Sequence, residues 1–148
     1  MRQTILVADD DENDRFFVRR EFAKLAPPPE LKFVPDGEKA LAYLKGEGEF
    51  SDRINCPAPS VIFLDLKMPR LNGFEVLEWI RRHEPIRRIP VVVLSSSSAQ
   101  EDIDKAYGLG ANAYLVKPAD VVEFQKLFRT TGEFFLDHAE TPSLPRPA

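Results

Sequence analysis

Cysteine and histidine are scarce in this sequence: one cysteine, Cys56, and two histidines occur among its 148 residues. A single thiol excludes an intramolecular disulfide, and Cys56 has no histidine near it in sequence that would make it a nucleophile. Purely apolar runs reach only four or five residues, whereas a helix that spans a bilayer needs roughly 20. Charges fall within the first ten residues, unlike in a signal peptide. We therefore expect a cytoplasmic protein without a membrane partner.

An excess of positive charge is also lacking, because 20 Lys and Arg residues stand against 24 Asp and Glu residues and give a net charge of −4. Proteins that bind nucleic acid through its phosphates carry a basic balance or patch, so we expect no direct nucleic-acid partner. The chain is long enough for one domain with its own core. We place this domain at residues 2–138 and interpret residues 139–148 as a proline-rich, flexible tail.

Short apolar runs alternate with helical patterns along the chain. We expect strands at 4–8, 31–34, 61–66, 89–95 and 113–116, and helices at 12–26, 36–46, 74–83, 99–110 and 120–138. Asp11 is expected to cap the first helix. Strands that are apolar throughout belong to parallel sheets covered by helices on both faces, which predicts an α/β fold. In such folds the functional crevice lies at the carboxyl ends of the strands.

Polar and charged residues collect where these strands end. They are, in chain order, Asp9 and Asp10, Asp65, Ser95 and Lys117. If the first and third strands are neighbours, three carboxylates share one pocket, and each pair at about 4 Å repels by roughly 4 kcal/mol at an effective dielectric near 20. A lysine and a divalent cation would offset this repulsion, and oxygen ligands favour Mg²⁺ or Mn²⁺ over zinc. Metal, carboxylate, lysine and hydroxyl together are typical of phosphoryl transfer.

Four motifs in this order resemble the receiver domains of bacterial two-component response regulators. They are "ADDD", "VIFLDLKMPRLNGFEVL", "PVVVLSSS" and "GANAYLVKP". The spacing of thirty residues from Asp65 to Ser95 and of twenty-two from Ser95 to Lys117 agrees with the family pattern. The resemblance covers residues 2–138 and implies a flavodoxin-like, doubly wound (βα)5 fold with strand order 2-1-3-4-5.

The resemblance also implies roles for the residues at the strand ends. Asp65 would be the phosphoacceptor, and Lys117 would pair first with Asp65 and then with the phosphoryl group. The direct ligands of Mg²⁺ would be Asp10, Asp65 and the backbone carbonyl of Lys67. Asp9 would act through a coordinated water. Lys67 stands where family members vary, and we expect it to alter the autodephosphorylation rate in a direction that the sequence leaves open.

Two further residues would form the switch of such a receiver. Ser95 would turn toward the phosphoryl group, and Tyr114 would change rotamer with it. Many members carry threonine at the position of Ser95, so the packing of this switch would be looser here. The bond between Lys117 and Pro118 is expected to be cis and to aim the lysine into the pocket.

The resemblance implies a response regulator that accepts a phosphoryl group from a histidine kinase or a phosphotransfer protein and signals by binding other proteins. Its only catalysis would be its own phosphorylation and dephosphorylation. The loop at 46–59, the serine run after the fourth strand and the aromatic last helix are similar to stand-alone regulators paired with phytochrome-type kinases. Two alternatives stay open: a phosphatase or phosphotransferase with an aspartyl-phosphate intermediate, and a degenerate receiver that acts as an adaptor without phosphorylation.

The last helix carries many large apolar side chains. They are Phe124, Leu127, Phe128, Phe134, Phe135 and Leu136. Some must face the sheet, and the surplus predicts a homodimer surface, since exposed aromatic patches usually mark interfaces. A helix that buries all of them against its own sheet is the alternative.

Overall fold

A computed structural model describes residues 3–142 and 144 as a doubly wound α/β domain. Its strands are β1 (Thr4–Ala8), β2 (Glu30–Val34), β3 (Val61–Asp65), β4 (Val91–Ser95) and β5 (Ala113–Val116). They form one five-stranded sheet in the order β2-β1-β3-β4-β5, with parallel pairing throughout. The predicted fold class and strand order are therefore confirmed.

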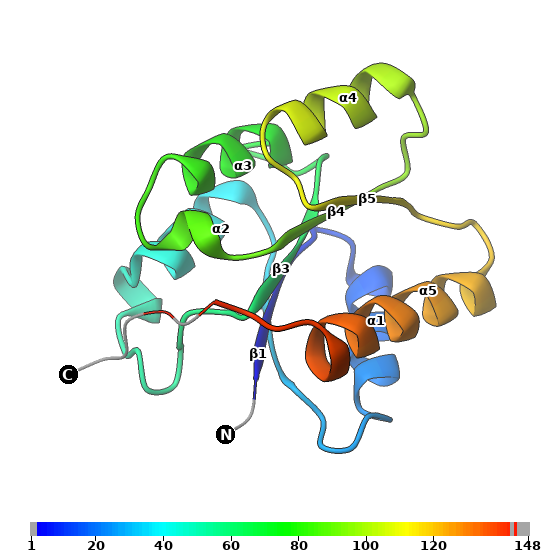
Figure 1. The fold of residues 1–148 in the computed structure, drawn as a ribbon, viewed down its shortest axis with the longest axis horizontal. Coiled ribbons are helices and arrows are strands. Elements are labelled where there is room, and N and C mark those ends of the chain that lie inside the picture. The colour runs from blue at the N-terminus through cyan, green and yellow to red at the C-terminus, as the bar shows by residue number, and fades with distance from the viewer. Residues whose placement is uncertain (1–2, 143, 145–148) are drawn as a thin grey trace.

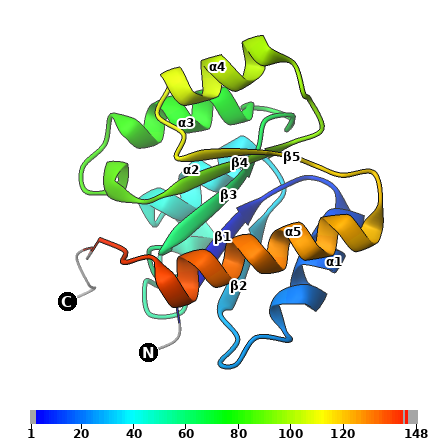
Figure 2. The ribbon, with the colours of Figure 1, turned by 45° about the vertical axis from the view of Figure 1, so that its right-hand side comes forward.

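Helices cover both faces of this sheet (Figures 1 and 2). They are α1 (Glu12–Phe22), α2 (Gly37–Lys45), α3 (Gly73–Arg81), α4 (Gln100–Gly108) and α5 (Val121–Glu133). Helices α1 and α5 lie on one face, and α2, α3 and α4 lie on the other. None of the helices within the described residues is long and apolar enough to cross a membrane.

The core is divided by the sheet into two layers, because successive strand side chains point to opposite faces. Leu6, Ile62 and Val93 belong to the layer under α2 and α3. Val7 and Phe63 belong to the layer under α1 and α5, where Phe22, Phe124 and Phe128 meet them. This two-sided burial explains why the three central strands, β1, β3 and β4, are almost continuously apolar, whereas the partly buried edge strand β2 alternates.

Most helix ends lie within two residues of the sequence-based expectation, but the ends of the first and last helices differ by more. The first helix ends at Phe22 rather than residue 26, because the prolines at 27–29 lack N–H donors and disfavour helical backbone in the residues before them. The last helix is α-helical only to Glu133, and Phe134–His138 continue it as a π-helical turn. The predicted tail at 139–148 falls partly outside the described residues, so the domain boundary at residue 138 stays a prediction.

Candidate functional site

The strand register brings the predicted residues to one end of the sheet. Ala8 of β1 pairs with Leu64 of β3, so Asp9 and Asp65 are neighbours there. An open pocket of about 520 Å³ lies at this end. Its lining residues are Asp10, Asp11, Asp14, Asp65, Lys67, Ser96, Lys117, Pro118, Ala119 and Phe124. This position agrees with the rule that ligands of open α/β sheets bind beyond the carboxyl ends of the strands.

Three aspartates in this pocket form a group that could hold a metal ion. Asp9, Asp10 and Asp65 each offer a carboxylate oxygen, and these oxygens lie within 4.8 Å of one another. Asp9 and Asp65 are buried, whereas Asp10 is exposed. An oxygen-only set that is open to solvent on one side suits a hard divalent cation that keeps some of its water. The residues present therefore fit the predicted Mg²⁺ or Mn²⁺.

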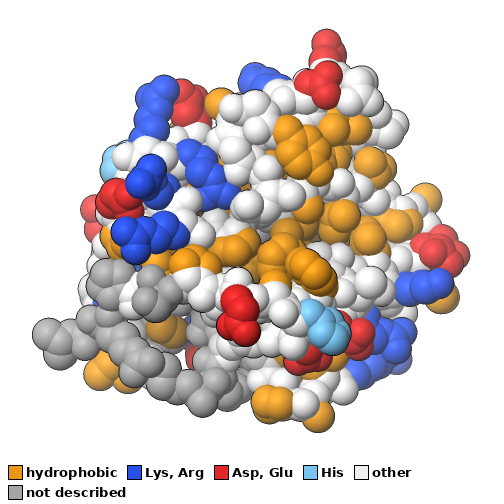
Figure 3. Space-filling view, viewed as in Figure 1, with side chains coloured by type: hydrophobic (Ala, Val, Ile, Leu, Met, Phe, Trp, Pro, Cys, Tyr) orange, Lys and Arg blue, Asp and Glu red, His pale blue; other side chains and the backbone are white. Residues whose placement is uncertain are grey.

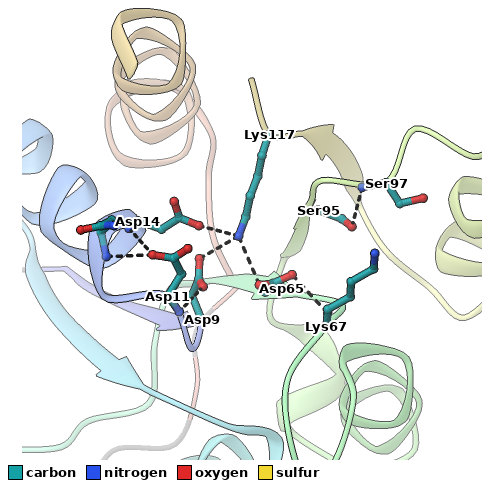
Figure 4. A network of polar contacts seen from close by, with 9 residues as sticks. Asp9, Asp11, Asp14, Asp65, Lys67, Ser95, Ser97 and Lys117 are labelled. Atoms are coloured by element: carbon teal, nitrogen blue, oxygen red, sulfur yellow. Dashed lines mark hydrogen bonds and ion pairs between the residues drawn. The ribbon is translucent and has the colours of Figure 1, made fainter. Parts of the chain in front are cut away.

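Lys117 joins the acidic residues into one network (Figure 4). Its Nζ donates to Oδ2 of Asp9 at 3.1 Å, of Asp14 at 2.7 Å and of Asp65 at 3.2 Å. Burial alone lowers the pKa of Lys117, but the hydrogen bond to Asp14 and the charges of the three carboxylates outweigh burial and raise it. The lysine is therefore a fixed positive charge beside Asp65.

Asp9 lies deepest in the cluster and has an exposed fraction of 1%. Burial raises its pKa to about 7, although Lys117 and the backbone N–H of Asp11 both lower it. The nearby charge of Asp65 adds to the rise. Burial therefore disfavours the ionised form of this carboxylate, and a bound cation would favour that form.

The phosphoacceptor candidate is held by the loop that follows it. Oδ1 of Asp65 accepts a hydrogen bond from the backbone N–H of Lys67 at 3.2 Å. The N–H of Gly73, at the start of α3, donates to the carbonyl of Leu66 at 2.9 Å and ties the loop back to β3. The side chain of Lys67 is exposed and lines the pocket. Asp65 is thus oriented by backbone as well as by Lys117.

The predicted switch residues are linked through Ser97. Ser95 is fully buried, and its Oγ accepts a hydrogen bond from the N–H of Ser97 at 3.1 Å. The hydroxyl of Tyr114 donates to the carbonyl of Ser97 at 2.9 Å. Ser96, rather than Ser95, lines the pocket. Ser95 and Tyr114 therefore contact the same residue of the loop between β4 and α4.

The expectation for Pro118 was wrong. Among the described residues, the cis peptide bonds precede Pro27 and Pro85, and the bond between Lys117 and Pro118 is trans. The N–H of Lys117 donates to the carbonyl of Ser95 at 2.8 Å, which continues the pairing of β5 with β4 to the edge of the pocket. From there the long side chain reaches the carboxylates with a trans bond.

Two contributors were missed by reasoning from the sequence. Asp14 makes the shortest contact to Lys117, at 2.7 Å, although it was not among the residues expected in the pocket. Its place in the first turn of α1, directly after the strand end that carries Asp9 and Asp10, was a usable signal. Ser97 had no such signal, since its role depends on the path of a loop.

Comparison with known proteins identifies the family of this chain. The model of the response regulator receiver domain matches residues 5–129. The chain belongs to this family. The response regulator Rcp1 of Synechocystis sp. is 34% identical over 143 residues, which cover 97% of this chain and 93% of that protein. The probable methanogenesis regulatory protein FilR2 of Methanothrix harundinacea is 32% identical over 141 residues, covering 93% of this chain and 86% of FilR2.

Solved receiver structures agree with this assignment. The phosphorylated cyanobacterial phytochrome response regulator RcpA has a TM-score of 0.92 and 35% identity, covering 97% of this chain and all of that one. The Mn²⁺-bound form of Rcp1 has a TM-score of 0.89 and 33% identity, covering 95% of this chain and 99% of that one. The response regulator RPA3017 in red light signaling of R. palustris has a TM-score of 0.88 and 38% identity, covering 96% of this chain and 99% of that one. The chain is thus related to phytochrome response regulators.

Proposed function

We propose that this receiver domain accepts a phosphoryl group on Asp65 in a reaction that requires Mg²⁺ or Mn²⁺. The single observation that carries the proposal is the convergence of Asp9, Asp10, Asp65 and Lys117 at one end of the sheet. Such a site combines a carboxylate nucleophile with positive charge beside it, which are the requirements of phosphoryl transfer to an aspartate. The Mn²⁺-bound structure of Rcp1 supports the choice of metal.

In the proposed reaction, a carboxylate oxygen of Asp65 attacks the phosphorus of a phosphohistidine. The bond between phosphorus and the imidazole nitrogen breaks, and its electron pair returns to the imidazole. The ammonium of Lys117, 3.2 Å from Oδ2 of Asp65, neutralises charge on the transferring group. Asp10, Asp65 and the carbonyl of Lys67 would hold the cation and Asp9 would hold its water. The cation would supply further charge neutralisation.

The proposed phosphodonor is a sensor histidine kinase of the phytochrome type or a phosphotransfer protein. RcpA and RPA3017, whose names connect them with phytochrome and with red light, support the first choice. The output would be a change in protein binding, with Ser95 turning toward the phosphoryl group and Tyr114 moving with it. The contacts of both residues to Ser97 would pass this movement to the loop before α4.

A direct test is incubation with acetyl phosphate and Mg²⁺, followed by measurement of the intact mass. We expect one phosphoryl adduct on the wild type and none on Asp65→Asn or in the presence of a chelator. Asp65→Asn is close in shape, so thermal denaturation should show it folded. An unmodified wild type, or an adduct that persists in Asp65→Asn, would contradict the proposal. Steady release of phosphate from a phosphoester would instead favour the phosphatase alternative.

We also propose a homodimer that includes the last helix, through a surface different from the one expected. Phe124 and Phe128 are buried against the sheet. Large apolar side chains that stay exposed on α4, β5, α5 and the π-helical turn are Tyr107, Val116, Val121, Val122 and Phe134. Figure 3 shows hydrophobic side chains gathered between α4 and α5. Light scattering that finds only monomer, with and without acetyl phosphate, would contradict the dimer.

A further inference from the structure

Lys117 contacts a third carboxylate, that of Asp14, in addition to those of Asp9 and Asp65. An ammonium has three N–H donors, and each of the three can be matched to a carboxylate here. The contact to Asp14, at 2.7 Å, is the shortest, since those to Asp9 and Asp65 measure 3.1 and 3.2 Å. A phosphoryl group that arrives on Asp65 therefore meets a lysine whose donors are already engaged.

The backbone of Asp14 is held in place without the help of Lys117. Its backbone N–H donates to Oδ1 of Asp11, the N-cap of α1, at 3.2 Å. Its side chain is 20% exposed, whereas those of Asp9 and Asp65 are 2% and 8% exposed. A carboxylate that reaches water loses a partner at a smaller cost than a buried one. Of the three contacts, the one to Asp14 is therefore the least costly to break.

We propose that Asp14 is a positioning residue, which holds Lys117 on the α1 side of the pocket and competes for its ammonium with the phosphoryl group on Asp65. This inference rests on the proposed function. With acetyl phosphate, an oxygen of Asp65 bonds to phosphorus while the bond from phosphorus to the acetate oxygen breaks, and its electron pair leaves with acetate. The ammonium stabilises charge on the transferring group, so a lysine held by Asp14 stabilises it less.

The first experiment compares Asp14→Asn with Asp11→Asn. Both variants remove one negative charge from the lining of the same pocket, but only Asp14 contacts Lys117. Asparagine also keeps an oxygen that can cap α1 at position 11. We expect the initial phosphorylation rate at limiting acetyl phosphate and saturating Mg²⁺ to rise roughly three- to tenfold in Asp14→Asn, because a neutral acceptor holds an ammonium about half as strongly. Asp14→Glu should restore most of the wild-type rate.

The second experiment reads the position of the lysine without any reaction. In unphosphorylated protein that carries nitrogen-labelled lysine, the Nζ resonance of Lys117 is identified by its loss in Lys117→Arg. We expect this resonance to move in Asp14→Asn and to stay in place in Asp11→Asn. A merely structural role for Asp14 would not produce this difference, and thermal denaturation checks that both variants are folded.

The outcomes separate this inference from the proposed function. If the rate rose equally in Asp14→Asn and Asp11→Asn, the loss of negative charge from the pocket would explain the effect. That result would overturn this inference and leave the proposed function standing. A slower reaction in Asp14→Asn, or an unmoved Lys117 resonance, would overturn it as well. A wild type that acetyl phosphate leaves unmodified would overturn the proposed function and this inference together.

Discussion

Gly73 at the start of α3 lies directly against the carbonyl of Asp65. A β carbon placed on Gly73 would fall 2.3 Å from that oxygen and 2.7 Å from the α carbon of Leu66. Both neighbours are backbone atoms, so neither can rotate away as a side chain could. The absence of a side chain at this position lets α3 begin close enough to β3 to donate its first N–H to the loop that follows Asp65.

Gly73→Ala should therefore move the backbone around Asp65. We expect the free energy of unfolding in urea to fall by about 1–3 kcal/mol, the usual cost of overpacking, and phosphorylation by acetyl phosphate to slow. Gly108→Ala is the matched control, since a β carbon there meets nothing within 4 Å. It should be neutral or stabilise α4 by about 0.5–1 kcal/mol. Equal stability of the two variants would contradict the close approach.

The raised pKa of Asp9 predicts a pH dependence of stability. Its pKa is about 7 in the folded protein against 3.8 in the unfolded chain. Between these values the folded state holds a proton that the unfolded state has lost, so stability of the metal-free protein should fall as pH rises from about 4 to about 7. Each pKa unit corresponds to about 1.4 kcal/mol. Urea denaturation across this range, with chelator present, measures the effect.

Asp9→Asn and added metal serve as the controls for this dependence. The amide has no proton to lose, so the variant should show a flatter profile and exceed the wild type in stability at pH 8 without metal. Saturating Mg²⁺ should stabilise the wild type at pH 8, because it binds the folded state in preference to the unfolded one, and should do so less in Asp9→Asn. A wild-type profile that rises between pH 4 and 7 would show that burial does not govern this carboxylate.

Much of this site could be predicted from the sequence because its residues lie at the ends of strands or directly after them. Apolar runs place strand ends within a residue or two, so Asp9, Asp65 and Lys117 were found from the sequence and lie together. The contact of Asp14 could not be found this way, because it depends on how α1 rotates against the sheet. The cis bond at Pro118 was carried over from the family resemblance rather than from a physical argument, and it was wrong.

The helix cap at Asp11 is a local feature and was predicted correctly. Its carboxylate accepts from the N–H groups of Asn13 at 2.8 Å and Asp14 at 3.2 Å. Asp11→Ala leaves both donors without this partner and should lower the free energy of unfolding by about 1 kcal/mol. Asp11→Asn should lose only a fraction of that. Thermal or urea denaturation distinguishes the two, and an alanine variant as stable as the asparagine variant would argue against the cap.

Glu21 of α1 is a buried carboxylate that joins α1 to α5. Only 1% of its side chain is exposed, and its Oε2 accepts a hydrogen bond from Lys24 at 3.1 Å. Its Oε1 lies 2.9 Å from Nε of Arg129, in an ion pair without hydrogen-bond alignment. Because Arg129 is half exposed, the charge of Glu21 depends on partners that solvent can reach.

Arg129→Met should remove a positive charge beside Glu21 and lower the free energy of unfolding by about 2 kcal/mol. A buried charge that has lost its partner destabilises a protein more than the replacement of both partners by apolar side chains. Adding Glu21→Met removes that charge and fills the same space with an apolar side chain. The double variant should therefore be more stable than Arg129→Met alone in urea denaturation. A double variant that is less stable than the single one would mean that Glu21 is accommodated by Lys24 and by neighbouring packing rather than by Arg129.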